Sequence, residues 1–307
     1  MASAVSHTET VEQADRSGTG GNGTAAAPAG VQVGKFASEI KPVWCPGCGS
    51  YGVLGVLRKV LQSLELKPEN VMLTSGIGCS SRLAAYVGTY GYHTLHGRAL
   101  PVALGGYLVN PQLTHLVVGG DGDIFSIGGG HLPHMARRNP KITVFVLDNE
   151  IYGLTKGQAS PTTPPSTKSK SMPNRVLEPP LNPALMCLAY DVSFFARAYA
   201  VKIPQLIDIM SQAIRHPGMA VVQVLNPCVT FNNMLETWNE MVQPIPEGHD
   251  PGNRLAAMSL AMDEEHLYTG VFYKTLRPTL MDAVRANREQ TAARVPADLQ
   301  RIIEQYA

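Results

Sequence analysis

The feature that most constrains the fold is a repeated alternation of short β-branched runs with helical patterns over residues 33–228. Apolar residues recur at helical spacing over residues 53–64, and the β-branched run 71–74 that follows predicts a strand. Residues 142–147 are nearly all apolar, as expected for a strand buried on both faces of a sheet. Because such alternation is typical of α/β domains, we predict a mostly parallel sheet with helices on both faces.

The length of 307 residues fits one large domain or two small ones. Residues 1–32 are rich in Gly, Ala, Ser and Thr, so we expect a disordered N-terminal tail. The α/β domain that carries the candidate site is predicted to span residues 33–232. Residues 233–307 have polar helical patterns and are interpreted as a partly helical C-terminal extension that could contact a partner. Within the domain, the proline-rich residues 158–180 predict an irregular segment.

Charge and hydropathy exclude several classes of function. The chain has 25 Lys and Arg against 24 Asp and Glu, a formal net charge of +1, which gives no sustained field to attract nucleic acid or anionic lipid. No apolar run approaches the ~20 residues that a membrane helix needs. The N-terminal residues lack the pattern of an export signal. We therefore expect a cytoplasmic protein that binds neither nucleic acid nor membrane.

Five cysteines, an odd number in a chain of this size without an export signal, favour reduced thiols or metal ligands over disulfides. Cys187 lies in an apolar helical pattern and is expected to be a buried hydrophobe. The other four form a candidate metal centre: Cys45, Cys48, Cys79 and Cys228. On spacing alone, a structural zinc site is the favoured interpretation. Two of the four thiols follow predicted strands near the candidate cofactor motif at residues 120–123. This position favours a redox cluster instead.

The run Gly120-Asp121-Gly122-Asp123 follows a predicted strand directly, and Asn149 follows the next one. A lone Gly-Asp-Gly is more often a turn in which Asp caps a helix. Because the carboxyl ends of parallel strands meet at one edge of a sheet, we instead expect Asp121 and Asn149 to lie close together. Carboxylate and amide oxygens suit a hard divalent cation that also holds diphosphate oxygens.

Three further polar side chains are candidates for the site. His93 and His96 lie in a predicted polar loop, where a surface or capping role and a ligand role are both open. Arg82 follows Cys79 by one helical turn and could hold a substrate carboxylate in bidentate fashion, although a solvated helix arginine is equally compatible.

Taken together, Gly120-Asp121-Gly122 with Asn149 resembles the thiamine-diphosphate fingerprint of enzymes that decarboxylate 2-oxoacids. The four cysteines resemble the cluster ligands of the beta subunit of the 2-oxoacid:ferredoxin oxidoreductases, and the resemblance covers roughly residues 42–232. It implies that Mg²⁺ is bound by Asp121, Asn149 and the Ile151 carbonyl, and that the four cysteines hold a [4Fe-4S] cluster. It also implies a cofactor-binding set formed by Ile77, Gly78, Cys79, Ser80, His96, Gly122, Asp123, Gly153 and Leu154.

The function implied by this resemblance is oxidative decarboxylation of a 2-oxoacid to acyl-CoA and CO₂, with electrons passing through the cluster to ferredoxin. An alpha subunit is expected to supply the second thiamine-binding module and the activating glutamate. Residues 153–158 resemble members of the family that act on 2-oxoglutarate, and pyruvate remains an alternative. Two other interpretations are a non-redox thiamine enzyme with structural zinc and an electron-transfer module without thiamine chemistry.

Overall fold

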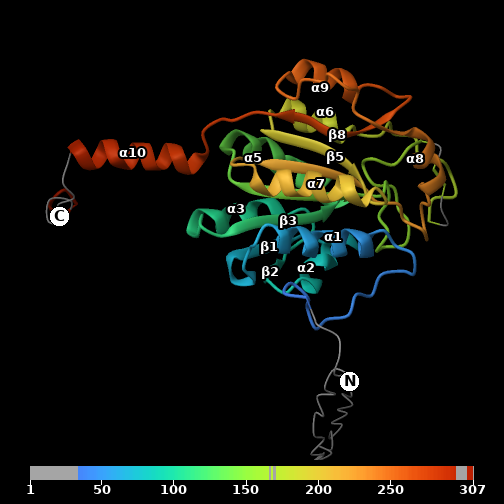
Figure 1. Cartoon of the computed structure of the whole chain (residues 1–307), viewed down its shortest axis with the longest axis horizontal. Coiled ribbons are helices and arrows are strands. Elements are labelled where there is room, and N and C mark those ends of the chain that lie inside the picture. The colour runs from blue at the N-terminus through green and yellow to red at the C-terminus, as the bar shows by residue number, and fades with distance from the viewer. Residues whose placement is uncertain (1–33, 166, 169–170, 295–302, 307) are drawn as a thin grey trace, which may run out of the picture. The chain divides into compact units, whose positions relative to one another are not determined.

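The computed structural model describes residues 34–165, 167–168, 171–294 and 303–306. The predicted tail at residues 1–32 lies outside this part of the chain. The centre of the described part of the chain is an eight-stranded sheet with the order β2-β1-β3-β4-β6-β5-β8-β7 (Figure 1). The strands are β1 (Val71–Ser75), β2 (Tyr90–His93), β3 (Thr114–Gly120), β4 (Ile142–Asp148), β5 (Phe194–Tyr199), β6 (Ala220–Leu225), β7 (Val242–Pro244) and β8 (Leu267–Lys274).

Strands β1–β6 are all parallel to one another, whereas β8 runs antiparallel to β5. Strand β7 then pairs in parallel with β8. The described α-helices are α1 (Ser50–Ser63), α2 (Leu83–Tyr86), α3 (Ala99–Val109), α4 (Asp121–Ile124), α5 (Leu132–Arg138), α6 (Pro183–Ala189), α7 (Ile203–Arg215), α8 (Leu235–Met241), α9 (Arg254–Ala261) and α10 (Leu280–Arg294). The predicted fold class, a mostly parallel sheet in an α/β domain, is confirmed.

Apolar side chains form two large cores, one on each face of the sheet, and a smaller third cluster around Trp238. Helices α1, α2 and α7 contribute to one core, and α3, α5, α6 and α9 to the other. Strand β3 shows the alternation directly, because Leu116 and Val118 join the first core and Val117 joins the second. All seven residues of β4 are buried, as its apolar sequence predicts.

The sequence predictions differ from the structure mainly at the edges of the sheet. Strand β2 is exposed along its whole length and has no apolar alternation, so its last residue, His93, was expected in a loop. Beyond residue 232, β7 and β8 extend the same sheet, so the predicted C-terminal extension contains strands as well as helices. Between β3 and β4, the 3-10 turn Ile127–His131 leads directly into α5.

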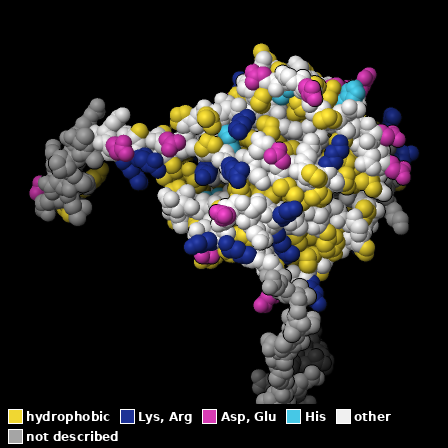
Figure 2. Space-filling model, in the orientation of Figure 1, with side chains coloured by type: hydrophobic (Ala, Val, Ile, Leu, Met, Phe, Trp, Pro, Cys, Tyr) yellow, Lys and Arg dark blue, Asp and Glu magenta, His cyan; other side chains and the backbone are white. Residues whose placement is uncertain are grey.

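The surface of the described residues agrees with the composition. Figure 2 shows positive, negative and hydrophobic side chains interspersed on the face in view, in keeping with a net charge of +1. Among the described helices, none is long and apolar enough to cross a membrane.

The strand order places a topological switch point between β1 and β3. Strand β1 lies between β2 and β3, so the connections that leave the carboxyl ends of β1 and β3 turn to opposite sides. In open α/β sheets, the crevice at such a point is the usual ligand site. The loops that begin at Gly76 and Gly120 therefore meet where a cofactor is expected.

Candidate active site

A cavity of about 550 Å³ opens at this switch point. Its walls come from the loops that follow β1, β3 and β4, together with the segment that follows β2. The cavity is lined by Ile77, Gly78, Cys79, Ser80, His96, Gly120, Asp121, Gly122, Asp123, Asn149, Ile151, Tyr152, Gly153, Leu154, Thr155 and Gln158. The structure thus brings together all of the residues that the sequence proposed for the cofactor and for Mg²⁺. We call this space the cofactor cavity.

Asp121 is the first residue of α4, directly after β3, and its side chain is buried. Its Oδ2 atom accepts a hydrogen bond of 2.8 Å from the Thr162 hydroxyl, and its Oδ1 atom lies 3.5 Å from the backbone nitrogen of Asn149. Burial and the charge of Asp148 raise the pKa of Asp121 to about 7. A bound cation would offset both effects, because it favours the ionised carboxylate.

Two more buried carboxylates lie behind Asp121. Burial raises the pKa of Asp148, and burial followed by the charges of Asp148 and Asp121 raises the pKa of Glu150 to about 9. Glu150 Oε2 has no hydrogen-bond partner among the described residues. The negative charge gathered at the ends of β3 and β4 would be offset by a hard divalent cation such as Mg²⁺ beside Asp121.

Asp123 joins the loops that surround the cavity. Its Oδ1 atom accepts hydrogen bonds from the Gly97 nitrogen at 2.7 Å and the Ile77 nitrogen at 3.1 Å, and it lies 3.0 Å from His96 Nδ1. A side chain at Gly76 would overlap the Asp123 carboxylate, with a Cβ only 1.8 Å from Oδ2. The contacts of this carboxylate support a role in holding His96 and two loops in place, rather than direct contact with a diphosphate of the same charge.

Gly122 is required at its position by a neighbour that sequence reasoning missed. A Cβ there would lie 2.2 Å from the Tyr152 ring, whose hydroxyl donates to the Gly122 carbonyl at 3.1 Å. The Tyr152 ring also lies beside His96, with 5.9 Å between ring centroids. Absence of a Cβ therefore lets the wall of the cavity close over α4.

The segment from Tyr152 to Gln158 forms a tight turn that completes the cavity. The Tyr152 nitrogen donates to the Gln158 carbonyl at 2.9 Å, and Lys156 takes a left-handed conformation with φ 76°. The hydroxyl of Thr155 donates to the side chain of Gln158. The sequence does not single out Thr155 and Gln158 individually, although the polar run 153–158 bears on the choice of substrate.

A second cavity, of about 230 Å³, is lined by all four predicted cysteines and is called the cysteine cavity below. Cys45 and Cys48 come from the loop before α1, Cys79 follows β1, and Cys228 follows β6. Burial and then the charges of the other three thiols raise the pKa of Cys79 to about 11, an effect that Arg82 opposes. Cys187 is fully buried in the apolar core, as predicted.

Backbone and aromatic contacts hold the first two cysteines near the third. The Cys48 nitrogen donates to the Cys45 carbonyl at 3.1 Å, and Gly47 in this turn has a φ of 79°. Trp44 Nε1 donates to the Cys79 carbonyl at 2.7 Å, and the Trp44 ring packs edge-on against Tyr51. The loop before α1 is thereby fixed to the segment after β1.

The two cavities share a wall. Cys79, Ser80, Asn149, Gly153 and Leu154 line both of them. A Cβ at Gly153 would lie 3.6 Å from the Cys228 sulfur, 3.7 Å from the Cys79 sulfur and 3.9 Å from Asn149 Nδ2. Thiols and the cation site are therefore separated here by a residue without a side chain.

The four thiols are not arranged around one small point. Within the described residues, no group of three or more His, Cys, Asp or Glu side chains is placed to hold a single metal ion. Four thiolates at ~2.3 Å from one zinc ion would lie about 3.8 Å from one another. The four thiols line a cavity of about 230 Å³, which is space for a metal centre.

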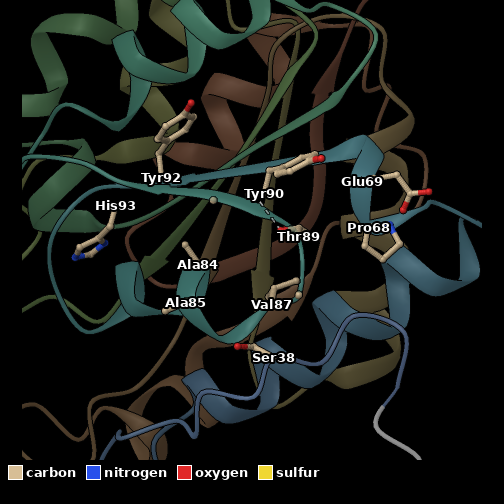
Figure 3. A pocket seen from close by; sticks show the side chains of 12 residues that line it. Ser38, Pro68, Glu69, Ala84, Ala85, Val87, Thr89, Tyr90, Tyr92 and His93 are labelled. Atoms are coloured by element: carbon tan, nitrogen blue, oxygen red, sulfur yellow. Dashed lines mark hydrogen bonds between the residues drawn. The ribbon is translucent and has the colours of Figure 1, made fainter.

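Arg82 and His93 are placed differently from the cofactor set. Arg82 lines the cysteine cavity together with Lys156, and it is not among the residues that line the cofactor cavity. His93 Nδ1 lies 2.9 Å from the Ser75 hydroxyl, and the ring faces a third cavity of about 630 Å³ along β2. Figure 3 shows Tyr90 and Tyr92 on one side of β2 in this third cavity.

Comparison with known proteins agrees with this geometry. Residues 76–224 match the family described as thiamine pyrophosphate enzyme, C-terminal TPP binding domain. Residues 228–289 match a second family, described as the C-terminal part of the beta chain of pyruvate ferredoxin oxidoreductase.

Individual relatives are also similar over most of the chain. The 2-oxoacid:ferredoxin oxidoreductase 2 subunit beta of Aeropyrum pernix is 46% identical over 214 residues, which cover 68% of this chain and 69% of that protein. The 2-oxoglutarate oxidoreductase subunit KorB of Mycobacterium tuberculosis is 44% identical over 66% of this chain and 54% of its own length. A solved structure of 2-oxoglutarate:ferredoxin oxidoreductase from Magnetococcus marinus, with 2-oxoglutarate, coenzyme A and succinyl-CoA bound, matches with a TM-score of 0.85. It is 41% identical and covers 89% of this chain and 94% of that chain.

Proposed function

Because this chain belongs to the beta subunits of the thiamine-dependent 2-oxoacid:ferredoxin oxidoreductases, we propose that it acts on 2-oxoglutarate. The reaction converts 2-oxoglutarate and coenzyme A to succinyl-CoA and CO₂, and the two electrons released reduce two ferredoxins. As a beta subunit, the chain works in a complex with an alpha subunit.

Thiamine diphosphate supplies the carbanion chemistry when it is bound. The donor set at the cofactor cavity fits it with Mg²⁺: Asp121, Asn149 and the Ile151 carbonyl would hold the cation. Gly122 and Gly153 line the cavity and present no side chain to a diphosphate there. His96 is held at the rim by Asp123, where its ring can contact the cofactor.

The cysteine cavity is proposed to hold a [4Fe-4S] cluster. All four thiols line one cavity that shares a wall with the cofactor cavity, and this position beside the cofactor supports a redox cluster. Cys79 belongs to both cavities, and this shared wall is the observation that carries the proposal. The shared wall of Cys79, Ser80, Asn149, Gly153 and Leu154 would separate bound thiamine diphosphate from a cluster held by the thiols.

The substrate proposal rests on the two relatives named for 2-oxoglutarate and on the basic residues near the shared wall. Arg82 and Lys156 line the cysteine cavity beside the shared wall, and a guanidinium that reaches across this wall would pair with the second carboxylate of 2-oxoglutarate in the cofactor cavity. Pyruvate lacks that carboxylate. The complex of this chain with its alpha subunit is expected to have a higher kcat/KM for 2-oxoglutarate than for pyruvate, and Arg82→Gln should reduce the difference. A preference for pyruvate in the unaltered complex would overturn the substrate assignment.

The alpha subunit is proposed to complete the site with a second thiamine-binding module and an activating glutamate. The described residues form one sheet with one cofactor cavity at its switch point, and thiamine enzymes of this kind hold the cofactor between two modules. Turnover is therefore expected only from the co-expressed pair, whereas full turnover by the isolated chain would contradict this division of labour.

A further inference from the structure

A buried chain of hydrogen bonds runs across the sheet beneath the proposed cation site. Arg197 Nε in β5 donates to Gln223 Oε1 in β6 at 2.9 Å, and Gln223 Nε2 donates to Asp148 Oδ2 at 2.8 Å. The Thr162 hydroxyl lies 3.0 Å from Asp148 Oδ1 and 2.8 Å from Asp121 Oδ2. None of these five side chains is more than 5% exposed. The chain thus links a strand near one end of the sheet to the first residue of the cation set.

The Thr162 hydroxyl has one proton and two carboxylates within reach. Asp148 is satisfied by other donors, because its Oδ2 accepts from Gln223 and its Oδ1 accepts from the Glu150 nitrogen at 3.1 Å. Besides Thr162, Asp121 is reached by the Ser160 side chain and by the distant Asn149 backbone nitrogen, at 3.5 Å from Oδ1. We therefore assign the proton of the Thr162 hydroxyl to the hydrogen bond with Asp121 Oδ2.

Thr162 is held in place without help from Asp121. The neighbouring Thr163 hydroxyl donates to the Glu150 carbonyl at 2.6 Å, and the Ser160 nitrogen donates to Thr163 Oγ1 at 2.7 Å. These bonds attach residues 160–163 to the loop after β4. The hydroxyl of Thr162 is accordingly a fixed donor behind Asp121, which itself lines the cofactor cavity.

We propose that Thr162 is a positioning residue for the cation site: its hydroxyl fixes Asp121 Oδ2, which leaves Oδ1 directed to the metal. This inference rests on the proposed function, since it takes Asp121 to be a Mg²⁺ ligand. The terminal torsion of an aspartate is broad, so a carboxylate without this donor samples other orientations. Mutation of a residue that orients a metal ligand in this way typically lowers metal affinity by about 10- to 100-fold.

The test uses the complex with the alpha subunit after removal of metal and thiamine diphosphate. Binding of thiamine diphosphate is followed by calorimetry at increasing Mg²⁺, without 2-oxoacid, so that the readout is independent of turnover. Thr162→Val should raise the Mg²⁺ concentration at half-saturation by about 10-fold or more. Thr162→Ser keeps the hydroxyl and should stay close to the unaltered complex.

A matched control is Thr143→Val. Thr143 lies in β4, is equally buried, and donates its hydroxyl to the Ala213 carbonyl at 3.1 Å, away from the cavity. Equal Mg²⁺ shifts for Thr143→Val and Thr162→Val would overturn the proposal, because the effect would then be one of stability alone. Asp121→Asn separates the two levels of the argument: if it leaves the Mg²⁺ dependence unchanged, the cation assignment itself fails, whatever Thr162 does.

Discussion

The cofactor cavity and the cysteine cavity share a wall but are built in different ways. The acids of the cofactor cavity are engaged by nearby donors such as Thr162 and the Gly97 nitrogen, so the site is shaped before a cation arrives. The cysteine cavity collects thiols from three distant segments, which are brought together by the strand ends and by the Trp44 contact to Cys79. The comparison indicates two centres that depend on separate residues and meet only at the shared wall, so each should be removable without the other.

The largest effect is expected from the residue that faces both cavities. Cys79→Ser removes one of the four thiols, so ferredoxin reduction should fall to background and iron and sulfide content should drop. Thiamine diphosphate should still bind, because the acids that hold the cation are unchanged. Iron analysis and calorimetry on the same anaerobic preparation check both outcomes. Cys187→Ala is the control, since this thiol lies in the apolar core and should leave iron content unchanged.

The converse change is Asp121→Asn, which replaces a charged ligand with a neutral one of the same shape. Thiamine diphosphate affinity in the presence of Mg²⁺ should fall about 100-fold, or roughly 3 kcal/mol. Iron and sulfide should remain at the level of the unaltered complex, because the cysteine cavity is not lined by Asp121. A variant that loses both centres would contradict their independence.

A smaller effect is expected where the cofactor cavity depends on packing. Gly122→Ala places a Cβ 2.2 Å from the Tyr152 ring, and overpacking of this kind costs about 1–3 kcal/mol. We expect weaker binding of thiamine diphosphate and a lower melting temperature, measured by calorimetry and thermal scanning. Gly105→Ala is the matched control, because no atom lies within 4 Å of its Cβ position. Equal behaviour of the two variants would show that the Gly122 contact is not what shapes the cavity.

The smallest effect concerns the core, away from both cavities. Burial, and then the charge of Lys274, lower the pKa of His216 to about 4, so it is neutral in the folded protein. An unfolded histidine has a pKa of about 6.5 and binds a proton more readily. The stability from this group is therefore present above pH 6.5 and is lost as the pH falls toward 4.

This pH dependence can be measured with one variant and one control. The melting temperature of the complex should fall less between pH 7.5 and pH 5 for His216→Gln than for the unaltered protein. His134→Gln, at an exposed position, should leave the pH dependence as it is. A slope that is the same for all three proteins would rule out His216 as its source.

The sequence predicted the parallel part of the fold because its strands are apolar and buried on both faces. The apolar run predicted as a strand at residues 142–147 lies within the observed strand β4, Ile142–Asp148. Strand β2 has no such pattern, because it lies at the edge of the sheet with its side chains exposed. Edge strands are shaped by their single neighbour and not by their own periodicity, so sequence patterns predict them poorly.

The same distinction applies to the site. Asp121, Asn149 and the four cysteines could be selected because a motif and the ends of strands marked them. Tyr152 and Thr162 could not, because their roles depend on contacts with residues 30 and 41 positions away along the chain. Long-range hydrogen bonds of this kind leave no local pattern. The polar proline-rich segment that carries Thr162 was predicted only as irregular.

The central claim is that one chain holds an iron-sulfur cluster beside a thiamine site. Anaerobic metal and acid-labile sulfide analysis of the complex with its alpha subunit, together with a visible spectrum, tests this most directly. The account predicts about four irons and four sulfides per copy of this chain and a broad brown absorbance, all retained in Asp121→Asn and lost in Cys79→Ser. Stoichiometric zinc without sulfide, in protein never exposed to oxygen, would contradict it and would favour a non-redox thiamine enzyme.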